Sequence, residues 1–227
     1  DQIKDSDFAP AFDAGMAIQL QEIAAIANNP EPPTFQNTIV AMEKTGQLLD
    51  RATSVFFNLV GTDKNDARDK LQTEYAPKFS AHRDAIALNP ALFARIKSLY
   101  DARAGLGLDP VDLRLLEKRY TDFVRAGAAL SDAQKARIRE INTEMSKLGT
   151  QFSQNVLAEV NDSAIVVDTR AELAGMSDEQ IAAAAEAAKA RGLEGKYVIA
   201  LLNTTGQPVL AQLHNRALRE RLHKASV

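Results

Sequence analysis

The chain has 227 residues, of which 45% are hydrophobic and 25% charged, and it contains no cysteine and no tryptophan. This balance excludes disordered, collagen-like and disulfide-stapled chains, and the length is ample for a buried core. The formal net charge of −3 lacks the basic excess of nucleic-acid-binding domains, and the absence of cysteine excludes thiol nucleophiles and zinc ribbons. Apolar runs fall far short of the roughly 18 residues of a membrane helix, so we expect neither nucleic acid nor membrane as a partner.

Two long helices are expected at the start of the chain. Apolar residues at steps of three and four predict the first across Phe12 to Ile26, ending before Asn28. Thr34 is the expected N-cap of the second, whose apolar seam runs from Phe35 to Val60. Gly46 lies on that seam, where we expect a close helix crossing.

The middle of the chain predicts three further helices before a turn. One runs from about Asp66 to Leu88, bent or broken at Pro77 because proline cannot donate to the helical ladder. Asn89-Pro90 starts a short helix, and Asp109-Pro110 is a cap followed by proline that opens another.

Residues 127–130 are the expected turn. A capping box follows it, in which Ser131 precedes Gln134 by three residues. It opens a helix whose apolar stripe has six members: Ile138, Ile141, Met145, Leu148, Phe152 and Val156. Because a short turn joins this helix to the one opened by Asp109-Pro110, we expect the two to pack as an antiparallel hairpin.

The pattern changes at Asn161. The β-branched run 164–167 and the run 196–202 predict strands on either side of an Ala-rich helix that Ser177 caps, an order that resembles one crossover unit. Thr204 to Pro208 reads as a turn into a last helix with apolar residues from Leu210 to Leu222. That helix has no stop signal before the chain ends, so we expect a chain cut inside or just after an element.

The expected fold is therefore mainly α. Antiparallel helical hairpins form a bundle, and a small two-strand β element lies in the C-terminal third. We expect a helical N-terminal domain over 1–160 and a strand-helix-strand-helix segment over 161–227.

The sequence assigns no catalytic, cofactor-binding or metal-binding residue. His214 and His223 are nine positions apart, which at about 100° per residue places them on opposite faces of one helix, and His82 has no second ligand nearby. Each histidine is therefore expected to be a surface or packing residue. Neither a G-x-S-x-G, a G-x-G-x-x-G nor a Walker motif occurs.

Whole segments of the chain nevertheless resemble the N-terminal region of bacterial peptidyl-dipeptidases, in the thimet-oligopeptidase family of zinc metallopeptidases. The similarity runs in order along nearly the whole chain, and the stretch NPEPPTFQNTI favours peptidyl-dipeptidases over the related oligopeptidase A type. The segments that carry it are 8–15 (FAPAFDAG), 29–46 (NPEPPTFQNTIVAMEKTG), 55–59 (VFFNL), 117–127 (EKRYTDFVRAG), 151–157 (QFSQNVL), 187–207 (AAKARGLEGKYVIALLNTTGQ) and 215–220 (NRALRE).

The resemblance implies a function that the residues alone do not. The family's zinc site is an H-E-x-x-H helix with a downstream glutamate, and no position here matches it, so this chain is expected to hold no cofactor and to lack activity. The resemblance implies the N-terminal part of a zinc enzyme that releases C-terminal dipeptides from short peptides. This part would form one wall of the substrate channel, with the enzyme's own C-terminal catalytic domain as its partner.

An alternative remains, namely a stand-alone helical scaffold or peptide-binding module without catalysis. A nucleic-acid-binding protein is a distant third because charge opposes it. The acidic, polar N-terminal residues show no signal pattern, and the sequence leaves a cytoplasmic and a periplasmic location equally open.

Overall fold

A computed structural model describes residues 3–63, 65–202 and 206–226. The chain divides into two compact units, Asp1–Gln151 and Phe152–Val227. This division falls inside a single long helix, α7 (Asp132–Asp162), ahead of the boundary expected after residue 160. As expected, the described structure is mainly helical, with a two-strand sheet in the C-terminal part.

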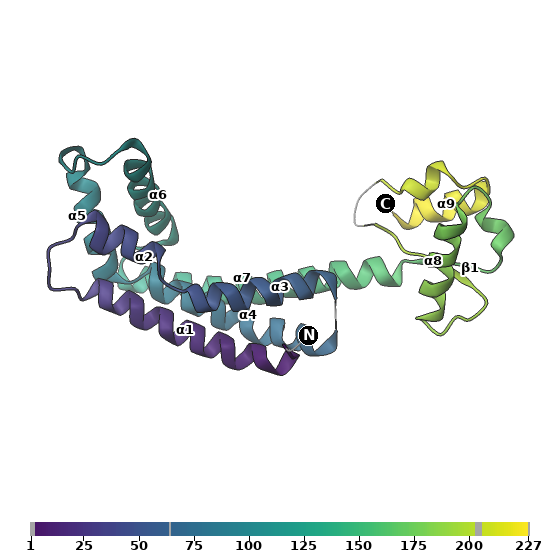
Figure 1. Cartoon of the computed structure of the whole chain (residues 1–227), viewed down its shortest axis with the longest axis horizontal. Coiled ribbons are helices and arrows are strands. Elements are labelled where there is room, and N and C mark those ends of the chain that lie inside the picture. Colours follow the sequence, from purple (N-terminus) through teal and green to yellow (C-terminus); the bar gives the residue numbers. More distant parts are fainter. Residues whose placement is uncertain (1–2, 64, 203–205, 227) are drawn as a thin grey trace. The chain divides into compact units, whose positions relative to one another are not determined.

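Three long helices lie side by side in the first unit, α1 (Asp5–Ala27), α3 (Gln47–Thr62) and α4 (Asp66–Ala87) (Figure 1). α1 and α3 approach closely at Gly15 of α1, where an added Cβ would lie 2.9 Å from Cα of Leu49 in α3. An aromatic cluster fills the space between these three helices, and its buried members are Phe8, Phe12, Phe56 and Tyr75. Ring centroids of neighbouring members lie 5.1–5.9 Å apart, so the bundle is fixed by direct aromatic packing.

The segment after Thr34 departs from the single helix that its spacing predicts. Thr34 is the N-cap, since its Oγ1 accepts from the Asn37 N–H at 3.0 Å. The chain then forms a π-helical turn (Phe35–Val40) and a short helix, α2 (Ala41–Glu43), before α3 starts. The prediction of one continuous helix is wrong because Gly46 adopts a left-handed φ of 75°, which ends α2 and turns the chain into α3.

Gly46 is nevertheless a point of close approach. A side chain there would collide with the amide group of Gln19 in α1, and the Gly46 N–H donates to Glu22 Oε2 at 2.8 Å. Glycine is therefore favoured by the backbone conformation, and a larger residue would in addition displace the end of the Gln19 side chain.

The prolines inside the long helices do not end them. α4 continues through Pro77, so the expected break is absent, and α1 begins five residues before Pro10. Tertiary packing along both helices outweighs the one ladder hydrogen bond that each proline removes.

The second core of the first unit lies where α5 (Pro90–Ala102) packs against α6 (Pro110–Ala126). The expected caps are present, because Asn89 Oδ1 accepts from Leu92 N and Asp109 Oδ1 accepts from the N–H groups of Val111 and Asp112. A short 3₁₀ turn (Arg103–Gly105) ends the hairpin's first arm. The fully buried members of this core are Ile39, Leu92, Ile96 and Leu116.

α7 starts where the sequence predicts but packs differently. Ser131 N–H donates to Gln134 Oε1 at 3.0 Å, which confirms the cap. The expected antiparallel hairpin with α6 is wrong, since α7 does not pack along α6. It runs in the direction of the long helices α1, α3 and α4 instead (Figure 1). Gly127 ends α6 at a φ of 102°, and the left-handed turn there directs the chain away from α6.

The second unit contains the small sheet. β1 (Ile165–Val167) pairs with β2 (Tyr197–Ile199) in antiparallel fashion, with Ile165 opposite Ile199. The order of strand, helix and strand is as expected, and Ser177 caps the helix, α8 (Asp178–Lys189). The interpretation as a crossover unit is wrong, because such a unit needs parallel strands and these two are antiparallel. A 3₁₀ turn (Arg170–Leu173) precedes α8.

The last helix is shorter than its apolar pattern suggests. A 3₁₀ turn (Pro208–Ala211) contains Leu210, and α9 (Arg216–Ala225) begins only after the Asn215 cap. Of the expected turn at 204–208, positions 204 and 205 lie outside the described residues, as does Val227. The core of this unit is made by buried side chains that include Val167, Leu173, Ile199, Leu213, Leu218 and Leu222.

Candidate functional site

The three histidines occupy two kinds of environment. His82 is buried in α4, whereas His214 and His223 are exposed in the second unit. His214 precedes the cap of α9, so the two do not share a helix as the sequence suggests. Within residues 3–63, 65–202 and 206–226, His, Cys, Asp and Glu side chains form no group of three that could hold a metal ion. The described residues therefore do not fit a zinc site.

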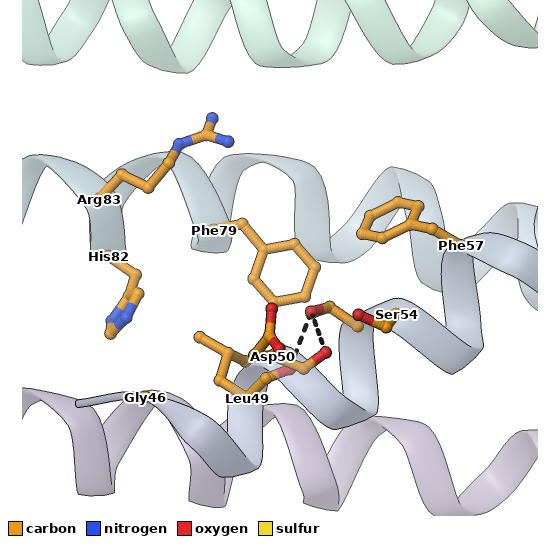
Figure 2. Close-up of a pocket in the computed structure, with 9 residues that line it drawn as sticks. Gly46, Leu49, Asp50, Ser54, Phe57, Phe79, His82 and Arg83 are labelled. Carbon is orange, nitrogen blue, oxygen red and sulfur yellow. Dashed lines mark hydrogen bonds between the residues drawn. The ribbon is translucent and has the colours of Figure 1, made fainter. Parts of the chain in front are cut away.

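A pocket of about 520 Å³ lies between α3 and α4 (Figure 2). It is the candidate binding site that the sequence did not reveal. Gly46, which precedes α3, lines one end of it. The residues of α3 that line it are Leu49, Asp50, Thr53, Ser54 and Phe57, and those of α4 are Phe79, His82 and Arg83.

The apolar part of this pocket is formed by Leu49, Phe57 and Phe79. The rings of Phe57 and Phe79 face each other from the two helices, with their centroids 6.3 Å apart. Phe57 is half exposed, although its neighbour Phe56 is fully buried. An apolar recess of this size with a few polar groups at its margin is the usual form of a small-ligand or side-chain pocket.

The polar part of the pocket carries opposite charges on its two helices. Asp50 of α3 and Arg83 of α4 are both exposed. Thr53 does not offer a free hydroxyl, because its Oγ1 donates to its own helix at Leu49 O, 2.8 Å away. The pocket can therefore contact an apolar group and pair with a charge of either sign.

His82 has a structural position beside this pocket. Its side chain is 7% exposed and leaves α4 on the side opposite Arg83 (Figure 2). Nε2 lies 2.7 Å from Gln19 Oε1, an oxygen that only accepts, so Nε2 carries the proton. Nδ1 is buried without a hydrogen-bond partner among the described residues.

This environment lowers the pKa of His82 below its ordinary value, mainly through burial and secondarily through the charge of Arg83. A neutral imidazole held in this way joins α4 to α1 through Gln19. Its role is to position the helices that carry the pocket.

Sequence reasoning missed the pocket because its apolar residues look like ordinary core positions. Phe56 and Phe57 are adjacent, and only their different exposure separates the core residue from the pocket residue. That difference follows from the spacing of α3 and α4, which no local pattern records.

None of the helices in the described part of the chain combines the length and apolar character needed to cross a membrane.

Comparison with known proteins gives a consistent result. No protein-family model matches the chain. Dipeptidyl carboxypeptidase of Escherichia coli is 46% identical over 222 residues, which are 98% of this chain and 33% of that protein. The enzyme of the same name from Salmonella typhimurium is 44% identical over 100% of this chain and 33% of its own length. Oligopeptidase A of Haemophilus influenzae is 28% identical over 99% of this chain and 33% of its own length.

The chain thus spans about a third of the length of these relatives. The higher identity to the dipeptidyl carboxypeptidases agrees with the resemblance carried by the segment 29–46. Over almost its entire length, the chain matches the N-terminal third of dipeptidyl carboxypeptidase and oligopeptidase A, which are peptidases of the thimet-oligopeptidase family.

Proposed function

We propose that this chain is the N-terminal, channel-forming part of a zinc-dependent peptidyl-dipeptidase that releases C-terminal dipeptides from short peptides, and that it is inactive alone. The observation that carries the proposal is the match of nearly the whole chain to one third of dipeptidyl carboxypeptidase at 46% identity. In this proposal zinc and the catalytic groups belong to the enzyme's C-terminal part.

The architecture of the first unit supports a wall-forming role. The close approach of Gly15 to Leu49 and the aromatic cluster around Phe12 hold α1, α3 and α4 in fixed positions. A substrate channel needs such a rigid wall, because residues on packed helices are positioned more accurately than residues on loops.

A hybrid enzyme tests the proposal. This chain replaces the matching third of Escherichia coli dipeptidyl carboxypeptidase, and release of dipeptides from a short peptide with a free carboxyl end is measured by mass spectrometry. We expect activity from the hybrid, and none from the 227-residue chain or from the Escherichia coli protein lacking its matching third.

Three results would contradict the proposal. Dipeptide release or stoichiometric zinc binding by the chain alone would remove the inactive-part interpretation. A folded hybrid without activity would remove the channel role.

The second candidate function is a peptide-binding module without catalysis, and the pocket between α3 and α4 favours it. The apolar recess at Phe57 and Phe79 fits one apolar side chain, and Arg83 offers a charge to a peptide carboxylate. Calorimetric titration of the isolated chain with short apolar peptides tests this function. Binding that is lost in Phe79→Ala and kept in Phe93→Ala, which removes an equally large ring from the other core, would support it.

A further inference from the structure

The long helix α7 has an exposed apolar face in the first unit. Ile141, Met145 and Leu148 follow one another at steps of four and three, so they lie on one side of the helix. Met145 is 65% exposed and Leu148 57% exposed, and Ile141 is also exposed. We refer to these three residues as the α7 stripe.

Next to the α7 stripe, at Asn142 and Ser146, the side of α7 that contacts the unit is polar instead. Asn142 Nδ2 donates to Oδ1 of the buried Asp84 in α4 at 2.8 Å. Asn142 and Ser146 line, with Asp84, a second pocket of about 460 Å³ that Met145 also borders. An amphipathic helix normally buries its apolar face. Here Asn142 holds this part of α7 to α4, and the α7 stripe remains exposed and available to another partner.

The charges beside the α7 stripe indicate what kind of surface would cover it. The exposed residues Glu140, Glu144 and Lys147 flank it and carry both signs. A membrane-surface helix or a nucleic-acid-binding helix carries a basic excess at this position. An apolar strip bordered by mixed charges is typical of a protein–protein contact.

The size of the α7 stripe distinguishes a second copy from a covalently linked partner. Stable dimers bury roughly 800 Å² on each partner, far more than three side chains supply. A segment of the same polypeptide needs much less area, because its effective concentration reaches roughly the millimolar range. The relatives are about three times as long as this chain, so their remaining two-thirds provide such a segment.

We propose that the α7 stripe is the surface against which the remaining two-thirds of the peptidase packs. This inference rests on the proposed function, because it assumes that the chain works as part of a longer enzyme. It adds the location of the contact, on α7.

Thiol protection tests the location. The chain has no cysteine, so Met145→Cys and Leu148→Cys each introduce a single reporter. Ala136→Cys is the matched control, since Ala136 is exposed on the same helix but on the face opposite Met145. Maleimide labelling rates are compared between the isolated chain and the Escherichia coli hybrid, in which the cysteines of the added part are replaced by serine.

We expect labelling at positions 145 and 148 to be at least tenfold slower in the hybrid than in the isolated chain, with no change at position 136. Equal rates in an active hybrid would overturn this inference and leave the proposed function intact. An inactive but folded hybrid would instead contradict the proposed function. If the hybrid is insoluble, the same cysteines are placed at the aligned positions of intact Escherichia coli dipeptidyl carboxypeptidase and labelled before and after unfolding in urea.

Two further results would assign the α7 stripe to a different occupant and overturn the proposal. Protection in the isolated chain that grows with its concentration would indicate a second copy. Rapid labelling in the hybrid that abolishes dipeptide release would indicate that the α7 stripe faces the peptide substrate.

Discussion

The guanidinium of Arg95 donates through Nη2 to Oδ1 of Asn37, at 2.9 Å, and so joins α5 to the π-helical turn. The same Oδ1 accepts from the N–H of Thr34 at 2.8 Å. Nη1 of Arg95 donates to the carbonyls of Asn29 and Glu31, at 2.9 and 3.0 Å. One buried side chain therefore fixes the connector within 29–37, which belongs to the stretch whose sequence resembles peptidyl-dipeptidases.

Replacing Arg95 with Met should remove about 2–4 kcal/mol from the free energy of unfolding, because a buried side chain loses three hydrogen bonds to the connector at once. Arg95 is 7% exposed, so water does not readily replace the guanidinium. Urea unfolding of Arg95→Met measures the loss, and Arg114→Met, at an exposed arginine of α6, is the control. Equal stabilities of the two variants would contradict the role of Arg95.

The lowered pKa of His82 predicts a pH dependence of stability. Because the unfolded chain binds this proton more tightly, the contribution of neutral His82 is fully present above about pH 6.5 and is lost as the pH falls below that value. His82→Gln should therefore weaken the fall in stability on acidification. Urea unfolding at a series of pH values measures it, with His223→Gln as the comparison for removal of an exposed histidine. A His82→Gln variant that keeps the full wild-type slope would be inconsistent with a buried neutral imidazole.

Two helical glycines should respond in opposite ways to alanine. Gly15→Ala places a Cβ 2.9 Å from Cα of Leu49 and should cost about 1–3 kcal/mol, because backbone must shift. Gly149→Ala meets nothing within 4 Å and should stabilise the chain by about 0.5–1 kcal/mol through helix propensity. Thermal unfolding of the two variants gives the comparison, and a shift of the same sign in both would rule out the close approach of α1 and α3.

The hydroxyl of Tyr75 ties α4 to α1, because it lies 3.0 Å from Asp13 Oδ1 and 3.1 Å from Ala9 O, both acceptors. Tyr75→Phe should reduce the free energy of unfolding by about 1 kcal/mol, as expected for one lost hydrogen bond in a packed site. Burial, and then the bond to Asp13, raise the pKa of Tyr75 above its usual value. The contribution is therefore full below about pH 10 and is lost as the pH rises further. Tyr197→Phe, at a half-buried tyrosine of the second unit, is the matched control in chemical unfolding, and an equal loss there would show that the effect is not specific to Tyr75.

Local chemistry explains which features of the fold the sequence could predict. The starts of helices were correct where a cap oxygen acts on its own chain, as at Thr34, Asp109 and Ser177. The interruption at Gly46 was missed, because a single glycine within an apolar seam is equally compatible with a helix crossing. The left-handed φ of Gly46 decides between them, and no local pattern records it.

The features that the sequence could not predict depend on which elements pack against each other. The periodicity of α7 shows that Met145 and Leu148 share a face, but it contains nothing about what covers that face. For the same reason neither the absence of α6–α7 packing in the described structure nor the antiparallel pairing of β1 and β2 could be obtained from spacing. The pocket at Phe57 and Phe79 depends on the separation of two helices, so it appears only once their positions are known.

The π-helical turn at Phe35–Val40 has a consequence for comparing this chain with its relatives. A π turn closes its hydrogen bonds over one residue more than an α turn. Phe35, Thr38 and Ile39 all lie in the interior. Their spacing of i, i+3 and i+4 would place them on one face of an α-helix as well, so the spacing of the apolar residues does not reveal the π turn. A relative with one residue fewer in this turn would keep the same length of helix on either side but would rotate the residues before it by about 100°. Residues on the two sides of Ala41 should therefore be compared as separate helical registers.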